Sequence, residues 1–254
     1  MEDATSFIIS ETVDDIGIIT LARTEALNAI TLEMLNELAC QVQTFDYDEN
    51  IRAIIIKGND KTFAAGIDIK ELGEEVSQQS FALDLWYEEF KKIESCSKPI
   101  IAAVAGYALG IGCELAMACD IILAADNARF GHPEISLGIL PGFGACSKLT
   151  HRLGKAKTME MILTGKALTA AEADAGGIIS RIVPLSDLDA ESIRVAKRIA
   201  AQPYQAIIES KQTIKQVANM SLQNGIDLES KSCKLSLNTQ EFRFQLEKFM
   251  QNNS

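Results

Sequence analysis

The sequence predicts an α/β domain with parallel strands that continues into a helical C-terminal segment. Short β-branched runs recur at 51–56, 99–104 and 120–125, and the chain between them is long enough for the crossover helices that parallel pairing requires. Towards the C-terminus the apolar residues follow helical spacing instead. We therefore place a core domain at 1–200 and a helical segment at 201–254.

The N-terminal elements follow from the same spacings. Apolar runs at 7–9 and 16–21 are separated by polar residues, which indicates a β-hairpin. Thr31 suits a helix N-cap, because its hydroxyl can accept a free N–H of the first turn. Apolar residues at helical spacing then continue to about Tyr47. Two strands and an amphipathic helix are thus expected before the first parallel strand.

Later elements are assigned in the same way. Residues 77–93 and the segment after Gly110 are typical of helices, and 178–183 is typical of a short strand. Further helical patterns run at 187–201, 203–218, 220–235 and 239–250.

Composition excludes several functional classes. The chain has 254 residues, of which 47% are hydrophobic and 23% charged, as in an ordinary folded protein. A formal net charge of −11 opposes nucleic-acid binding. We expect no membrane partner, because the sequence contains neither a signal segment nor an apolar run of about 18 residues. The six cysteines form no CxxC pair and there are only two histidines, so we expect reduced thiols, a cytoplasmic protein and no metal site.

The first segment with chemical potential is Phe63-Ala-Ala-Gly-Ile-Asp-Ile-Lys70, which follows a strand and opens a helix. Gly66 permits a tight turn, and the free N–H groups of a helix start can hold a negatively charged oxygen. The alternative is an ordinary loop in which Asp68 only caps the helix.

The second segment, at 106–115, is another glycine loop that opens a helix. The N–H of Ile111 can supply a second donor to the same oxygen, which would complete an oxyanion hole. Glu114 follows in the first turn of a helix that is apolar nearly all round. A carboxylate in such a position is unusual unless it serves the site, although it could simply complement the helix dipole.

The third segment, at 131–142, carries Glu134 between a proline and an apolar run. Burial there would raise the pKa of this carboxyl group and allow proton exchange near neutral pH. One helix and one strand separate Glu114 from Glu134, so the chain can return to the same face of the sheet.

Together the three segments resemble the crotonase superfamily, the enoyl-CoA hydratase/isomerase fold. The family patterns are F-x-A-G-x-D-(I/L)-K-E, G-x-A-x-G-G-G-x-E-(L/F) and P-E-(I/V/L)-x-x-G-(I/L)-x-P-G, and this chain matches them in order. Leu27-Asn-Ala-Ile30 is similar to a fourth, earlier element. The resemblance implies a spiral of β-β-α units and a trimer or dimer of trimers assembled through the C-terminal helices.

The resemblance also implies residue roles. The N–H groups of Ile67 and Ile111 would bind the thioester oxygen, and Glu114 and Glu134 would hold and activate water. The coenzyme A arm and adjoining substrate atoms would lie along Arg23, Ala26, Leu27, Ala65, Gly66, Asp68, Ile69, Lys70 and Gly110. Coenzyme A is part of the substrate, so no separate cofactor is implied.

The implied activity is hydration of a 2-trans-enoyl-CoA thioester to 3-hydroxyacyl-CoA. The presence of both glutamates favours a hydratase over relatives that keep only one. The alternatives are a Δ3,Δ2-enoyl-CoA isomerase, which would use Glu134 alone, and a non-catalytic binding homologue. Ile111 stands where the family has its central glycine, and its β-branched side chain is expected to narrow the pocket.

Overall fold

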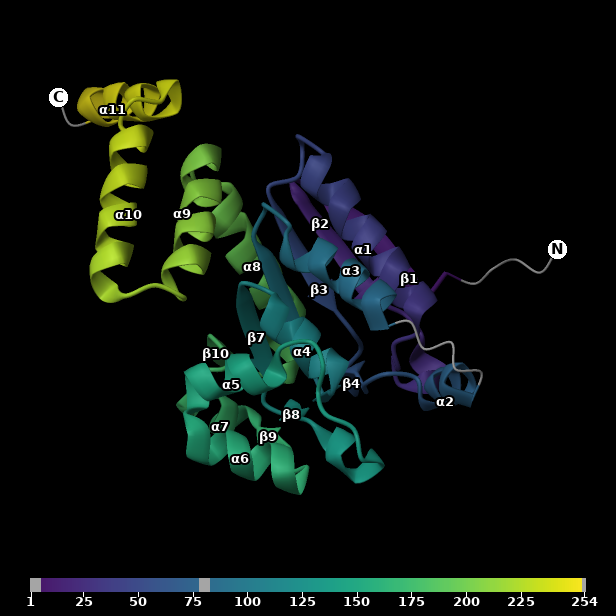
Figure 1. Ribbon diagram of the computed structural model, residues 1–254. Coiled ribbons are helices and arrows are strands. Elements are labelled where there is room, and N and C mark those ends of the chain that lie inside the picture. Colours follow the sequence, from purple (N-terminus) through teal and green to yellow (C-terminus); the bar gives the residue numbers. More distant parts are fainter. Residues whose placement is uncertain (1–5, 78–82, 253–254) are drawn as a thin grey trace.

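Two β-sheets form the centre of the molecule in a computed structural model that describes residues 6–77 and 83–252 (Figure 1). The larger sheet has six strands in the order β1-β2-β3-β5-β7-β10, and the smaller has four in the order β4-β6-β8-β9. The larger sheet is built from β1 (Ile8–Val13), β2 (Ile16–Leu21), β3 (Ala53–Lys57), β5 (Ile100–Val104), β7 (Ile121–Ala125) and β10 (Arg181–Val183). The smaller is built from β4 (Thr62–Ala64), β6 (Tyr107–Leu109), β8 (Arg129–Gly131) and β9 (Leu168–Thr169).

The helices lie around these sheets (Figure 1). They are α1 (Leu32–Tyr47), α2 (Ile69–Ser77), α3 (Leu83–Glu94), α4 (Ile111–Ala118), α5 (Ala145–Leu153), α6 (Lys155–Thr164), α7 (Ala170–Ala175), α8 (Leu188–Ala200), α9 (Tyr204–Val217), α10 (Leu222–Ser236) and α11 (Gln240–Asn252). Short 3₁₀ turns are η1 (Thr24–Ala26), η2 (Pro133–Leu137) and η3 (Leu185–Asp187). None of the helices in these ranges is long and apolar enough to cross a membrane.

The chain fills the two sheets alternately. β3, β5 and β7 enter the larger sheet, and each is followed directly by a strand of the smaller one, β4, β6 and β8. Pairing is parallel from β2 through β10 and from β4 through β8, while β1–β2 and β8–β9 are antiparallel. This repeat of strand, strand and helix confirms the predicted α/β fold.

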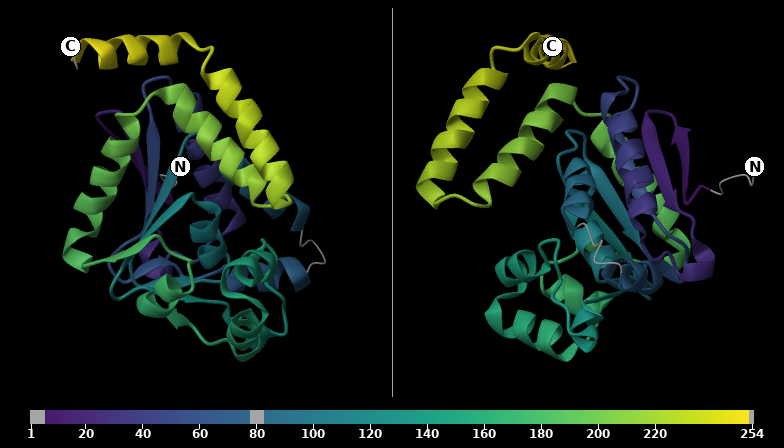
Figure 2. Two further views of the ribbon diagram at one scale, coloured as in Figure 1. Left: turned by 90° about the vertical axis from the view of Figure 1, so that its left-hand side faces the viewer. Right: turned by 45° about the vertical axis from the view of Figure 1, so that its right-hand side comes forward.

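Both faces of the central strands β2, β3, β5 and β7 are buried, which explains why these strands are apolar without alternation. On β3, Ile54 and Ile56 belong to a core shared with α1 and α3, whereas Ile55 belongs to a second core shared with α8. The two faces are thus covered by different helices, as the two views of Figure 2 also show. Trp86 of α3 is fully buried in the first core.

Most predicted boundaries are confirmed. The hairpin is present, and the Thr31 hydroxyl accepts the N–H of Met34 at 3.1 Å as the N-cap of α1. Of the helix expected at 77–93, the described part from Leu83 onward forms α3, and residues 78–82 lie outside the described ranges. The strand expected at 178–183 is also shorter, because Ser180 is still in the turn that leads into β10.

Helices α9, α10 and α11 extend away from the sheets (Figures 1 and 2). The ammonium of Lys211 on α9 forms an ion pair with Asp120 at 2.7 Å, which joins this helix to the core. Glu241 of α11 accepts the N–H of Tyr204 at 2.8 Å, so it caps the start of α9. A domain division between residues 200 and 201 stays a prediction.

Candidate active site

Three neighbouring parallel strands bring the three predicted segments together. β6 pairs with β4 on one side and with β8 on the other. Because the carboxyl ends of parallel strands meet at one edge of a sheet, the loops that follow these strands lie side by side. These loops carry Ile67, Ile111 and Glu134.

The first loop aims one backbone N–H away from its neighbours. Ile30 forms a parallel bridge with Ile67, in which the Ile30 N–H donates to the carbonyl of Gly66 at 2.7 Å and its carbonyl accepts the N–H of Asp68 at 2.9 Å. In such a parallel bridge Ile30 bonds to the residues on either side of Ile67, and Ile67 directs its own N–H away from Ile30. Gly66 has φ +117°, a conformation that suits glycine alone. The N–H of Ile67 therefore points away from Ile30 and is open to a ligand.

The second loop offers a matching donor. Ile111 is the first residue of α4, so its N–H has no acceptor within the helix. Gly110 precedes it with φ +52° and donates its own N–H to Gly131 at 2.9 Å. A Cβ atom at Gly110 would lie 3.5 Å from the Cα of Gly66. The two donor loops are therefore in close approach, as an oxyanion hole requires.

Glu114 is fixed in the interior one turn further along α4. Its side chain belongs to a residue only 1% exposed, and Oε1 accepts the N–H of Phe143 at 2.7 Å and of Ala145 at 3.0 Å. Burial is the main influence on this carboxyl group and raises its pKa, against the lowering effect of the two N–H donors and His132. Both hydrogen bonds end on Oε1, so within the described residues Oε2 is the oxygen available to a ligand.

The aromatic ring of Phe143 holds this anchoring segment in place. It stacks on Tyr87 with ring centroids 5.4 Å apart and lies 5.2 Å from the ring of Phe90. The N–H donors of Phe143 and Ala145 were not predictable from sequence motifs, because a backbone donor leaves no mark on residue type.

Glu134 stands over the second donor loop. A Cβ atom at Gly110 would lie 2.7 Å from Glu134 Oε1, so only glycine leaves room for the carboxylate. The expected deep burial of Glu134 is found only in part: its side chain is 16% exposed, and it is Glu114 that is enclosed. The Oε2 atom of Glu134 is nevertheless buried and has no hydrogen-bond partner among the described residues.

His132 is a site residue that the sequence motifs do not identify. It is fully buried, and its Nδ1 lies 3.6 Å from Glu134 Oε1, beyond hydrogen-bond distance. Burial lowers the pKa of His132, but the neighbouring Cys113 and Glu134 outweigh it, so the pKa lies above its ordinary value. In the sequence, the one feature that could have indicated a role for His132 is its position directly before Pro133-Glu134.

Arg23 and Asp68 are joined to each other. The guanidinium lies 2.6 Å from an Asp68 carboxylate oxygen and also donates to the carbonyl of Ala29 at 2.9 Å. Asp68 additionally accepts the N–H of Lys70 at 2.8 Å, so it caps α2. Asp68 therefore caps the helix, as the alternative interpretation of this residue expected. A contact of Arg23 or Asp68 with coenzyme A stays a prediction.

The segment containing Ala26 and Leu27 is fastened to the first donor loop. Leu27 has φ +53° and accepts the N–H of Ala65 at 3.2 Å. Asn28, which carried no assigned role, is fully buried and donates from its side-chain amide to the carbonyls of Thr62 and Phe63. Asn28 therefore fixes the early segment to β4.

Exposed side chains surround this fastened segment. Leu27 and Ile69 are each 54% exposed, and Lys70 is exposed on the first turn of α2. Two apolar surfaces beside an ammonium group suit a long thioester ligand with phosphates at one end. Contact of Ala26, Ala65 or Lys70 with coenzyme A stays a prediction.

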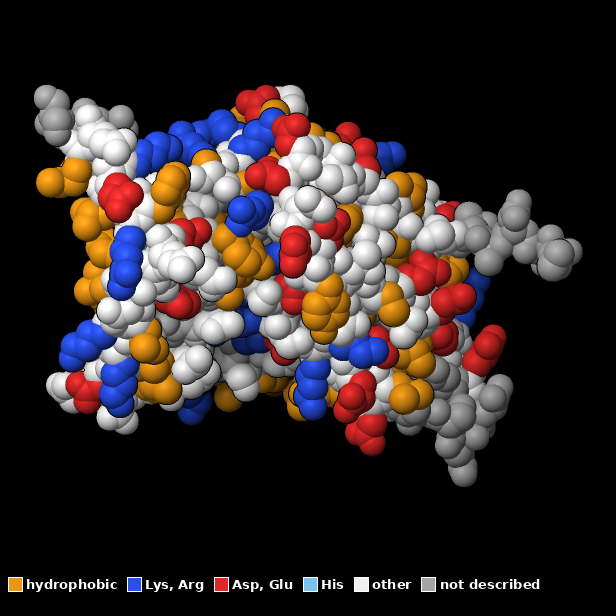
Figure 3. Space-filling view, turned by 90° about the horizontal axis from the view of Figure 1, so that it is seen from above, with side chains coloured by type: hydrophobic (Ala, Val, Ile, Leu, Met, Phe, Trp, Pro, Cys, Tyr) orange, Lys and Arg blue, Asp and Glu red, His pale blue; other side chains and the backbone are white. Residues whose placement is uncertain are grey.

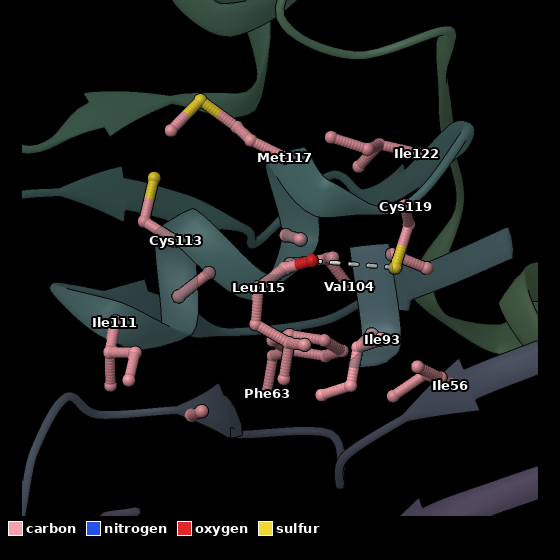
Figure 4. Packing of buried hydrophobic residues seen from close by; sticks show 14 of the residues in the cluster. Ile56, Phe63, Ile93, Val104, Ile111, Cys113, Leu115, Met117, Cys119 and Ile122 are labelled. Carbon is pink, nitrogen blue, oxygen red and sulfur yellow. Dashed lines mark hydrogen bonds between the residues drawn. The ribbon is translucent and has the colours of Figure 1, made fainter. Parts of the chain in front are cut away.

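The side chain of Ile111 packs into the interior. It is 1% exposed and belongs to the same core as Phe63 and Leu115, and Figure 4 shows it on the side of α4 nearest Phe63, with Cys113 on the other side. The Ile111 side chain therefore does not project from the protein surface, and the narrowing of the pocket that was expected from it does not arise in this way. Its N–H stays available because backbone donors do not depend on the side chain.

No group of three His, Cys, Asp or Glu side chains within the described ranges could hold a metal ion. His151 is exposed on α5. All six cysteines are free thiols, and Cys113 is buried.

Comparison with known proteins shows which family the chain resembles. The family described as enoyl-CoA hydratase/isomerase matches residues 11–253. A probable enoyl-CoA hydratase of Mycobacterium tuberculosis is 45% identical over 219 residues, covering 86% of this chain and 85% of the relative. The 2,3-dehydroadipyl-CoA hydratase of Escherichia coli is 36% identical and covers 92% of this chain and 91% of the relative.

Solved structures show the same likeness in three dimensions. The crystal structure of an enoyl-CoA hydratase from Thermoplasma volcanium superposes with a TM-score of 0.87 at 32% identity, covering 98% of this chain and 99% of that one. The likenesses in sequence and in structure therefore point to the same family. The chain belongs to the enoyl-CoA hydratase/isomerase family, the crotonase superfamily.

Proposed function

We propose that the protein hydrates 2-trans-enoyl-CoA thioesters to 3-hydroxyacyl-CoA, in the degradation of fatty acids or related acyl-CoA compounds. One observation carries the proposal. Two carboxylates, Glu114 and Glu134, and two outward N–H groups, of Ile67 and Ile111, gather at the carboxyl edge of β4, β6 and β8. The names of the relatives, all hydratases, support the same activity.

The N–H groups of Ile67 and Ile111 stabilise the charge that develops on the thioester oxygen. Attack of water on Cβ of the enoyl group moves an electron pair through Cα to this oxygen, giving an enolate. Donors already in place pay no reorganisation cost when the charge appears, and loss of one such donor costs about 2.7–4 kcal/mol of barrier in enzymes.

Glu114 and Glu134 then handle the water and its protons. Glu114 is held by Oε1 and offers Oε2, and Glu134 has a buried Oε2 with no partner among the described residues. An unpartnered buried carboxylate oxygen is a natural acceptor for a bound water. We assign water activation to Glu114, with Glu134 exchanging a proton with Cα.

Coenzyme A enters this proposal as part of the substrate. We place its arm along the exposed edge formed by Leu27, Ile69 and Lys70, with Arg23, Ala26, Ala65, Gly66, Asp68 and Gly110 lining the approach to the donors. Because Arg23 is already paired with Asp68, its part in binding is to hold that carboxylate away from the phosphates.

Self-association is proposed from the C-terminal helices. Among the residues whose burial is described, α9 and α11 have no buried residue, and α10 buries only Gly225. Large hydrophobic side chains gather there, and Figure 3 shows some of them at the left edge of the molecule. The exposed set includes Ile214, Leu222, Ile226, Leu235, Leu237, Phe242, Phe244 and Leu246. Soluble monomers rarely expose so much apolar surface, so we propose that other copies cover it in a trimer or dimer of trimers.

Light scattering on the purified chain tests this assembly. The proposal expects the mass of three or six subunits and a shift to smaller species in a Leu235→Glu variant. A matched control is Tyr47→Glu, since Tyr47 is 80% exposed at the end of α1, on the core. A monomeric parent would contradict the proposal.

A cytoplasmic location is proposed from the thiols. Cys40 and Cys233 are exposed and unpaired, a state that a reducing compartment maintains. Cell fractionation followed by immunoblotting tests it, and recovery in the soluble cytoplasmic fraction is the expected result.

A paired assay tests the activity. The hydratase proposal expects loss of the conjugated absorbance of a 2-enoyl-CoA, with little conversion of a 3-enoyl-CoA. Conversion of the 3-enoyl compound alone would favour a Δ3,Δ2-enoyl-CoA isomerase working through Glu134. Absence of both reactions, with thioester binding still measurable, would favour a non-catalytic homologue.

A further inference from the structure

His132 is enclosed in the protein without the contacts that a buried imidazole usually has. Both ring nitrogens are buried, and neither has a hydrogen-bond partner among the described residues. A buried polar group left unpaired destabilises the fold, so this ring needs a compensating interaction. The nearest candidate is electrostatic, because Nδ1 lies 3.6 Å from Oε1 of Glu134.

The groups around the ring make a positive charge favourable there. Glu134 faces it from its own segment, and Glu114 and Cys113 face it from α4. Arg152 of α5 lies beyond, close enough to interact electrostatically with Cys113. Two carboxylates thus share one enclosed site with one imidazole, and an imidazolium would reduce their repulsion.

We propose that His132 is a positioning residue of the active site: as an imidazolium it pairs with Glu134 and holds its carboxylate over Gly110. The ring acts through Glu134 and does not touch the reacting atoms. The inference rests on the proposed function, in which Glu134 exchanges the substrate proton. Two features of the structure support it: the contact between Glu134 Oε1 and Nδ1, and the room that Gly110 leaves for that same oxygen.

Nitrogen NMR tests the charge directly, without any need for activity. The chain has only two histidines, so a His151→Asn variant leaves His132 as the one imidazole signal. The proposal expects ¹⁵N shifts of an imidazolium at pH 7.5, and a Glu134→Gln change should lower the pH at which that proton is lost. A neutral imidazole at pH 6.5, or titration unaffected by Glu134→Gln, would overturn the proposal.

The pH dependence of kcat/KM tests the consequence for the reaction. His132→Gln keeps a hydrogen-bonding group but no charge, and His132→Leu keeps neither. Removing a cation beside a carboxylate raises the carboxyl pKa, typically by about one unit or more. The acid limb should therefore move to higher pH by about that amount in both variants, with KM changed less than twofold.

The two experiments separate the possible failures. An unshifted acid limb in an active His132→Gln enzyme would overturn the proposal. Complete loss of activity in His132→Leu, together with an unchanged pH profile in His132→Gln, would overturn it as well. Only packing or hydrogen bonding by the ring would then matter, and not its charge. If the His132 variants do not fold, the NMR comparison with Glu134→Gln still decides. If the parent hydrates no thioester, the proposed function fails while the NMR result continues to report on the His132 charge.

Discussion

Glu114 Oε1 accepts the backbone N–H of Phe143 at 2.7 Å, across 29 residues of sequence. This bond joins the first turn of α4 to the segment that leads into α5. It fixes one oxygen of a carboxylate that burial would otherwise disfavour, and it leaves the other oxygen for the reaction.

The first prediction concerns the ring that holds this donor. Phe143→Ala should lower kcat about tenfold and reduce the free energy of unfolding by about 3–5 kcal/mol, as other buried Phe→Ala changes do. Tyr87→Ala is the matched control, because it removes the same stack from a ring that is 40% exposed. Urea denaturation and steady-state kinetics measure both effects. Equal losses in the two variants would argue against a special role for Phe143.

The second prediction concerns the space above the second donor loop. In Gly110→Ala the new Cβ would lie 2.7 Å from Glu134 Oε1, so activity should fall at least a hundredfold. Gly154→Ala is the control for backbone strain, because Gly154 also has a positive φ, of +75°, but has nothing within 4 Å of the new atom. Each change should cost roughly 1–3 kcal/mol of stability from strain. Comparable activity in the two variants would contradict the placement of Glu134.

The third prediction concerns pH and the Arg23–Asp68 pair. Burial opposes the charge of Asp68, but the Arg23 guanidinium and the N–H groups of Glu71 and Lys70 outweigh it and lower the pKa. A lowered carboxyl pKa stabilises the fold above the unfolded value of 3.8, and this stabilisation is lost as the pH falls through the folded value. Asp68→Asn should therefore lower the Tm at pH 7 and have a smaller effect near pH 3, below the unfolded value.

The exposed pair of Lys197 and Asp14 provides the control for this effect. Its charged atoms are 2.8 Å apart, but the side chains are 52% and 67% exposed. Such exposed pairs contribute little to stability because water and salt screen them, so Asp14→Asn should leave the Tm nearly unchanged at both pH values. Thermal denaturation followed by circular dichroism measures the set. A Tm difference for Asp68→Asn that is the same at pH 3 and pH 7 would exclude the charge explanation.

Much of the site was predictable because its chemistry is local in sequence. Gly66, Gly110 and the carboxylates Glu114 and Glu134 stand in motifs whose glycines and helix starts have a direct physical meaning. The parallel strands of the larger sheet were predictable as well, since burial on both faces leaves continuous apolar runs.

The parts that could not be predicted depend on non-local contacts. Strands β4, β6 and β8 have three residues each, too few to show a spacing of two, yet their pairing aligns the three loops. The surroundings of His132 arise from α4, which is distant in sequence. Glu134 is less buried than Glu114 because η2, which carries Glu134, lies at the protein surface, whereas α4, which carries Glu114, lies in the interior. This difference also depends on how the chain folds over long distances.

The central claim is that Glu114 and Glu134 act together on one water beside the two N–H donors. The most direct measurement is the rate of crotonyl-CoA hydration by the parent, by Glu114→Gln, by Glu134→Gln and by the double variant, with the Tm of each recorded. Acid–base groups contribute about 10²–10⁴ in rate, so each single change should lower kcat by that order while the Tm stays within a few degrees. The double variant should be little slower than the slower single variant, because groups that act as a unit are not additive. Hydration within twofold of the parent in either single variant would contradict the account.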